Sequence, residues 1–77
     1  MTAEEFQTQF LQLKPQVQSY LFRLTAHRQD AEDLLHDTYL KASRNLSSFA
    51  AKAKLKTWVF AIATNLAKDN FRARQRY

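Results

Sequence analysis

The chain has 77 residues, no cysteine, no glycine, one proline and a formal net charge of +5. Its length suits a single domain with one small core, and the lack of cysteine excludes disulfides, thiol nucleophiles and thiolate metal sites. No apolar run is long enough to span a membrane, and Glu4 and Glu5 stand where a signal peptide would be basic. We therefore expect a cytoplasmic setting.

Charge is distributed unevenly along the chain. Residues 1–51 hold five basic and six acidic side chains, whereas residues 52–77 hold seven basic side chains against Asp69 alone. Four aromatic residues are interleaved with the basic ones in the second part: Trp58, Phe60, Phe71 and Tyr77. Cations that meet phosphates and rings that stack on bases are typical of nucleic-acid binding. A solvated basic face over core aromatics is the alternative interpretation.

Helical spacing of the apolar residues dominates, so we expect an all-α fold, a compact orthogonal bundle of about four helices. Thr2 and Glu5 predict a capping box at the start of a short first helix. Pro15 suits the first turn of a helix and not its interior, so a second helix is expected to begin there.

A third helix is expected to begin at Asp30, which can cap it, with Glu32 and Asp33 at the positive end of the helix dipole. Its predicted apolar stripe consists of Ala31, Leu34, Leu35, Tyr39, Ala42 and Leu46. The stripe predicted for the last helix consists of Leu55, Trp58, Val59, Ile62 and Leu66. A short loop is expected to join these two long helices.

The segment from Asp30 to Tyr39 reads DAEDLLHDTY. It resembles the D-A-E-D-L-x-Q-[ED]-x-F motif in domain 2 (region 2) of the extracytoplasmic-function group of sigma-70 family factors, with His36 in place of Gln. In that family the segment docks on the clamp helices of the RNA polymerase β′ subunit. The resemblance implies a core-binding set of residues: Asp30, Glu32, Asp33, Leu34, His36, Asp37, Leu40, Lys41 and Arg44.

The segment TWVFAIATN, from Thr57 to Asn65, resembles the family's T-W-L-[YF]-R-I-A-x-N motif on the helix that lines the path of the unwound DNA strand. By this resemblance Asn65 lines the pocket for a base flipped out of the minus-ten promoter element, and an ordinary exposed polar residue is the alternative. The DNA-binding set that the resemblance implies is Phe49, Lys52, Lys54, Lys56, Thr57, Trp58, Phe60, Thr64, Asn65, Lys68 and Arg72.

The loop before this helix departs from the family's F-R-G-x-S pattern. Phe49 matches, but alanine replaces the arginine, glycine and serine, and Ala61 stands where the family often has arginine. Lys52 and Lys54 replace the lost arginine only as point charges. The resemblance therefore predicts a DNA path without predicting which base is selected.

Two aromatic residues of the last helix keep alternative interpretations. Trp58 lies on the apolar stripe, so burial is expected first. Phe60 lies off the stripe, so its ring is either exposed for stacking on a base or packed against the first helix.

The resemblance implies a non-enzymatic transcription initiation domain that binds RNA polymerase core, recognises and melts the minus-ten element and binds non-template single-stranded DNA. No cofactor is expected, and His27 and His36 lack the ligand support that a metal site needs. The family also implies an anti-sigma factor as a partner and a separate region 4 domain. Residues 1–77 are therefore interpreted as the region 2 part of a longer protein. A protein-binding helical regulatory module and a small helix-turn-helix binder of duplex DNA remain the alternatives.

Overall fold

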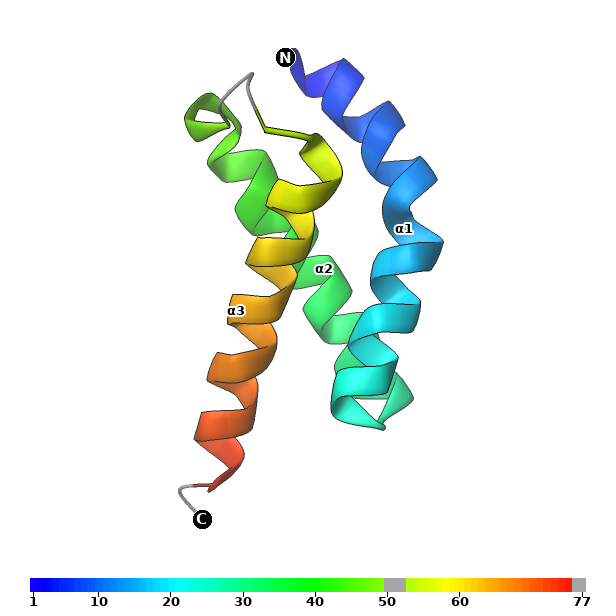
Figure 1. The fold of residues 1–77 in the computed structure, drawn as a ribbon, viewed down its shortest axis with the longest axis vertical. Helices are drawn as coiled ribbons and strands as arrows, with labels where there is room; N and C mark the ends of the chain where they lie inside the picture. The colour runs from blue at the N-terminus through cyan, green and yellow to red at the C-terminus, as the bar shows by residue number, and fades with distance from the viewer. Residues whose placement is uncertain (50–52, 76–77) are drawn as a thin grey trace.

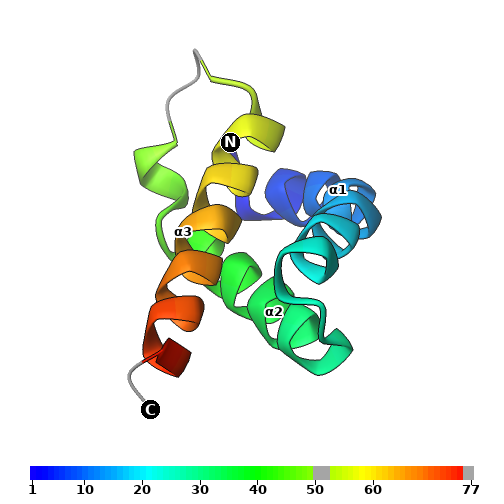
Figure 2. The same ribbon diagram turned by 60° about the horizontal axis from the view of Figure 1, so that its bottom comes forward.

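The computed structural model describes residues 1–49 and 53–75. They form α1 (Ala3–Thr25), α2 (Arg28–Arg44), the short 3-10 helix η1 (Leu46–Ser48) and α3 (Leu55–Gln75). α1 and α3 stand side by side while α2 crosses them obliquely (Figure 1), and the turned view in Figure 2 shows each α-helix against the other two. The all-α prediction is confirmed. The expectation of about four helices is wrong, because the described residues contain three α-helices.

The predicted break at Pro15 is the reason for the miscount, because α1 runs through the proline. Pro15 has no N–H to offer the carbonyl of Leu11, but both residues are exposed, so water can reach that carbonyl. On the opposite side, Phe10 before the proline and Val17 after it are both buried. The packing of these buried residues against the other helices outweighs the roughly 3 kcal/mol that an interior proline costs.

Local hydrogen bonds close both ends of α1. At its start, the Thr2 hydroxyl accepts the N–H of Glu5 at 3.1 Å and the Glu5 carboxylate accepts the N–H of Thr2 at 3.4 Å, which confirms the predicted capping box. At its end, Ala26 has a left-handed φ of 58° and donates its N–H to the carbonyl of Phe22 at 2.8 Å. A residue with a Cβ is disfavoured in that conformation by about 1 to 2 kcal/mol.

α2 begins at Arg28, two residues before the predicted start at Asp30. The N–H of Ala31 already donates to the carbonyl of His27 at 3.0 Å, so His27 occupies the cap position. Asp30 therefore lies in the first turn of α2, where its charge complements the helix dipole without capping the helix. The prediction of Asp30 as the cap is wrong, because the chain already turns into the helix after Ala26.

The core lies where the three helices meet. The rings of Phe6 and Phe10 pack on the ring of Tyr39, with centroids 5.7 and 5.1 Å from it. Thr38, which the predicted stripe of α2 left out, is fully buried and donates its hydroxyl to the carbonyl of Leu34 at 2.6 Å. This bond satisfies a hydroxyl that burial would otherwise leave unpaired.

α3 faces the core with a row of residues at four-residue steps: Leu55, Val59, Ala63 and Ala67. The two alanines present only a methyl group to α1 and α2, so the helix axes can lie close together. Trp58, Ile62 and Leu66, which were predicted in the buried stripe, are half-buried at its edge. The buried side of α3 is thus centred on smaller residues than the sequence pattern predicts. No helix in the described part of the chain has the length and apolar character needed to cross a membrane.

Candidate nucleic-acid interface

The outward side of α3 carries a row of polar and basic side chains, which we call the α3 row. With the exposed Ala61 included, its members follow one another at steps of four, four, three and four residues, a spacing that keeps them on one side of an α-helix. The α3 row consists of Thr57, Asn65, Lys68 and Arg72, and all four are exposed. It therefore presents two cations, an amide and a hydroxyl to solvent, with only the small Ala61 between them.

One edge of the α3 row is bounded by two aromatic rings. The rings of Phe49 and Trp58 are tilted at 44° with centroids 5.2 Å apart, and both residues are half-buried. Phe49 is held at the end of η1, where its N–H donates to the carbonyl of Leu46 at 3.0 Å. The Phe49 ring from the loop before α3 thus packs on the Trp58 ring of the expected DNA path. Lys54 is exposed at the start of α3, and Lys52 lies outside the described residues.

The other edge of the α3 row meets α1. The Phe60 ring packs on the Tyr20 ring, with centroids 5.2 Å apart. The Thr64 hydroxyl lies 2.7 Å from the Tyr20 hydroxyl and 2.8 Å from the Phe60 carbonyl, so Tyr20 donates to Thr64 while Thr64 donates to that carbonyl. Lys56 lies beside them, with Nζ 5.9 Å from the centroid of the Phe60 ring. Phe60 packs against α1 as one interpretation expected, yet it remains partly exposed.

The residues predicted to bind polymerase lie on α2. Six of them are exposed on its surface: Glu32, Asp33, His36, Asp37, Lys41 and Arg44. Leu34 points into the core, and Leu40 is half-buried within the outward row formed with Asp33, Asp37 and Arg44. Leu34 thus supports the shape of α2, whereas Leu40 adds an apolar patch to a charged surface.

A hollow of about 730 Å³ lies between α1 and α2 beside these residues. Glu32 and His36 form its α2 edge, Leu11 and Lys14 form part of its α1 edge, and Tyr39 is also in its lining. Two-thirds of Leu11 is exposed. The charged surface of α2 therefore continues into a partly apolar groove.

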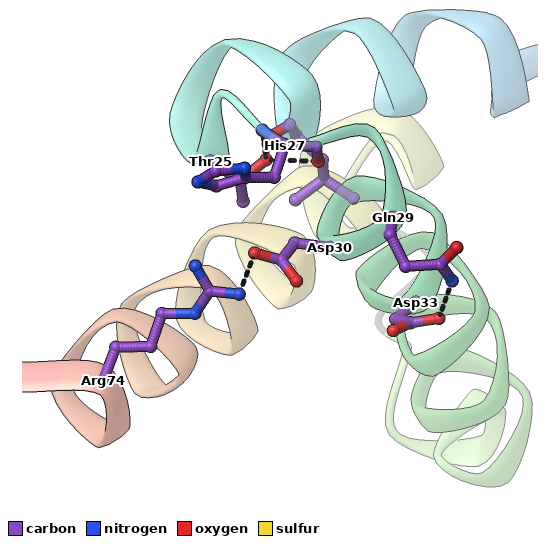
Figure 3. Close-up of polar contacts among 7 residues, drawn as sticks. Thr25, His27, Gln29, Asp30, Asp33 and Arg74 are labelled. Carbon is purple, nitrogen blue, oxygen red and sulfur yellow. Dashed lines mark hydrogen bonds and ion pairs between the residues drawn. The ribbon is translucent and has the colours of Figure 1, made fainter. Parts of the chain in front are cut away.

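Asp30 is placed differently from the other predicted docking residues. Its carboxylate forms an ion pair with the guanidinium of Arg74 near the end of α3, as Figure 3 shows. The Asp30 side chain is only 18% exposed, whereas that of Arg74 is 53% exposed. Sequence reasoning did not single out Arg74, because no local pattern relates residues that lie 44 positions apart. Asp30 thus joins the start of α2 to the end of α3.

Other polar contacts in Figure 3 support the turn between α1 and α2. The Thr25 hydroxyl lies 2.9 Å from the carbonyl of Leu21 and accepts the N–H of His27 at 3.3 Å. Gln29 donates its side-chain amide to the Asp33 carboxylate at 3.0 Å. In residues 1–49 and 53–75, no group of three His, Asp or Glu side chains is arranged to hold a metal ion.

Sequence comparisons relate the chain to known proteins. Residues 10–77 match the family model of sigma-70 region 2. The chain is 39% identical over 54 residues to the RNA polymerase sigma factor YlaC of Bacillus subtilis, a match that covers 70% of this chain and 31% of YlaC. It is 38% identical over 58 residues to the ECF RNA polymerase sigma factor SigG of Mycobacterium tuberculosis, covering 75% of this chain and 16% of SigG.

A third relative, the ECF RNA polymerase sigma factor SigW of Bacillus subtilis, is 31% identical over 62 residues, which are 80% of this chain and 33% of SigW. The chain therefore spans a third or less of the length of these relatives. Because the family model covers most of the chain, the fold and its two motifs define a sigma factor domain. The chain belongs to the sigma-70 region 2 family, as the resemblance to the extracytoplasmic-function group predicted.

Proposed function

We propose that this domain docks on the β′ clamp helices of RNA polymerase core through α2 and binds the non-template strand of the minus-ten promoter element along α3. The observation that carries the proposal is the separation of two surfaces on one small domain. The exposed charged residues predicted to bind polymerase lie on α2, and the α3 row lies on α3. A domain built in this way can hold polymerase and DNA at the same time.

Melting in this proposal is driven by binding energy, without an enzymatic step or a cofactor. Each base that leaves the duplex exchanges its neighbours for protein rings and cations, and stacking on an aromatic side chain is worth about 1 to 3 kcal/mol per base. Lys68 and Arg72 offer charge to the phosphates, and the half-buried rings of Trp58 and Phe60 border the strand. Promoter DNA, RNA polymerase core and an anti-sigma factor are the proposed partners.

Asn65 is the proposed base-reading residue. Its amide offers both a donor and an acceptor, which can read the edge of an unstacked base. Asn65 is exposed on the α3 row, clear of the ring contacts at both edges. Its neighbour Ala61 leaves room beside it. The proposed role therefore requires no movement of the helices.

The experiment compares binding of the domain to single-stranded minus-ten oligonucleotides, to the same sequences as duplexes and to a fragment carrying the clamp helices. We expect binding to the single strand and to the clamp fragment, with DNA affinity falling linearly in log–log form as salt rises. Preference for duplex without clamp binding would instead favour the helix-turn-helix alternative. Clamp binding without DNA binding would favour a protein-binding module.

Asn65→Ala tests the base-reading role in the same assay. We expect a changed preference among oligonucleotides that differ at one base, with the thermal unfolding midpoint unchanged because the side chain is exposed. Gln12→Ala is the matched control, since it removes an exposed amide from α1. If Asn65→Ala and Gln12→Ala leave the same base preference as the native chain, Asn65 is an ordinary surface residue.

A further inference from the structure

A shallow hollow of about 460 Å³ lies between α1 and α3, at the edge of the α3 row that meets α1. Its lining consists of Pro15, Gln16, Ser19, Arg23, Lys56 and Phe60. Two of these residues are cations, and they come from different helices. The aromatic residue is Phe60, whose ring is only partly covered. One ring and two cations in the same hollow are the combination that suits a nucleotide, because the ring can stack on the base and the cations can bind the phosphate.

Contacts with Tyr20 of α1 hold the Phe60 ring in a fixed position. It packs on the Tyr20 ring at 5.2 Å, and the Tyr20 hydroxyl is bonded to the Thr64 hydroxyl at 2.7 Å. Lys56 Nζ lies 5.9 Å from the ring centroid, which is the outer limit of a cation–π contact. The ammonium group therefore loses little cation–π interaction energy when it turns toward a phosphate. The ring is preorganised, and the cation beside it is adjustable.

Arg23 supplies the second cation without any competing carboxylate. From Phe6 to Gln29 the chain contains no Asp or Glu, and the one ion pair in the described part of the chain joins Asp30 to Arg74. Arg23 is exposed one turn of α1 beyond Ser19, which lines the same hollow. Its guanidinium is thus available to an anion from outside the domain.

We propose that the bound single strand leaves α3 at this point and crosses onto α1, with one nucleotide held in the hollow. Its base stacks on Phe60, and its phosphate lies between Arg23 and Lys56. The Ser19 hydroxyl and the Gln16 amide border the hollow as hydrogen-bonding groups. This inference rests on the proposed single-strand binding. It adds a DNA contact from α1, a helix that contributes no residue to the DNA-binding set predicted from the sequence.

The test compares Arg23→Gln with Lys14→Gln in the 77-residue chain. Each removes one positive charge from an exposed position on α1, but Lys14 lines the hollow on the α2 side. Binding of a fluorescein-labelled single-stranded oligonucleotide of mixed sequence is measured by anisotropy over a salt series. We expect Arg23→Gln to weaken binding about tenfold at low salt and to reduce the log–log salt slope by about 0.7, the value for one phosphate on a single strand. Lys14→Gln should leave the slope unchanged.

A proximity measurement makes the test independent of net charge. Ser19→Cys, labelled with a photoreactive benzophenone, should cross-link to the oligonucleotide, whereas the same label at Gln7→Cys should not. Ser19 lines the proposed nucleotide site and Gln7 lines the hollow between α1 and α2. Thermal unfolding of each variant verifies that the fold is retained.

The possible failures are distinguishable. If Arg23→Gln matches Lys14→Gln while Lys68→Gln lowers the salt slope, the strand follows α3 without crossing α1, and only this inference is overturned. Equal cross-linking from Ser19→Cys and Gln7→Cys overturns it as well. If the native chain shows no salt-dependent binding to single strands, the proposed function and this inference fail together.

Discussion

α2 and α3 are alike on their inward sides and different on their outward sides. Each buries small residues in the core, Ala31 and Ala42 in α2 and Ala63 and Ala67 in α3. Outward, α2 presents most of its acidic residues mixed with bases, whereas α3 presents the basic and polar α3 row. The inward sides determine how the helices pack, and the outward sides determine what each helix can bind.

One small core thus supports two chemically distinct surfaces. Aliphatic contacts between α2 and α3 are insensitive to the charges on the opposite sides, so either surface can be altered without disturbing the packing. Among the described residues, the two helices share one ion pair, between Asp30 and Arg74.

Ala63→Leu should have the largest effect, because it breaks the packing that both surfaces need. Ala63 is fully buried, and overpacking of such a site costs typically about 1 to 3 kcal/mol. Urea unfolding should show the loss, and binding to DNA and to the clamp fragment should fall together. Ala61→Leu is the matched control on the exposed side of the same helix. Equal stability of the two variants would contradict the assigned orientation of α3.

Tyr20→Phe should weaken DNA binding along α3 without affecting the binding surface on α2. It keeps the ring that packs on Phe60 and removes the hydroxyl bonded to Thr64, a loss worth about 0.5 to 1.5 kcal/mol of unfolding free energy. We expect weaker single-strand binding and unchanged clamp binding, measured on the same protein preparation. A matching loss of clamp affinity would show that this bond supports the whole domain.

Ala26→Gly should stabilise the domain without changing either surface. Ala26 is the residue with positive φ in the described backbone, and glycine adopts that conformation without a Cβ clash. Relief of the clash, reduced by the greater freedom of glycine in the unfolded chain, should raise the unfolding free energy by about 0.5 to 1 kcal/mol. Thermal unfolding measures the gain. A lower midpoint than that of the native chain would mean that the turn has a different conformation.

Of these interactions, the Asp30–Arg74 ion pair should make the smallest contribution to the free energy of unfolding. Half of the Arg74 side chain is exposed, so solvent screens the pair, and we expect a coupling energy of about 0.5 kcal/mol. A double-mutant cycle with Asp30→Asn and Arg74→Gln, followed by urea unfolding at low and high salt, measures it. The coupling should shrink as salt rises. A coupling that is large and independent of salt would mean that the pair is shielded from solvent.

Local features of the fold were readable from the sequence. The capping box of Thr2 and Glu5 was predicted because its two hydrogen bonds join residues only three positions apart. The continuation of α1 through Pro15 was not predicted, because the packing that carries the helix through the proline comes from helices that follow it in the chain. The burial of Thr38 and Ala63 was not predicted either. Small or hydroxyl-bearing residues do not stand out in an apolar stripe, and they become buried only through their neighbours.

The candidate site was readable in part. The resemblance to the family assigned the four residues of the α3 row to DNA binding, and the structure places them together on the exposed side of α3. Contacts between distant segments, such as Tyr20 with Thr64 and Asp30 with Arg74, follow no sequence pattern. The position of Lys52, which the resemblance assigned to DNA, lies outside the described residues.

The most direct test removes charges from each surface in turn and measures both binding affinities. Lys68→Gln with Arg72→Gln removes two cations from the α3 row, and Asp33→Asn with Asp37→Asn removes two charges from α2. Affinity for the single strand and for the clamp fragment is measured for both double variants. We predict that the first loses DNA affinity, with a salt slope reduced by about 1.4, and keeps clamp affinity, while the second does the reverse. Loss of both affinities in either folded variant would contradict the claim that α2 and α3 bind separate partners.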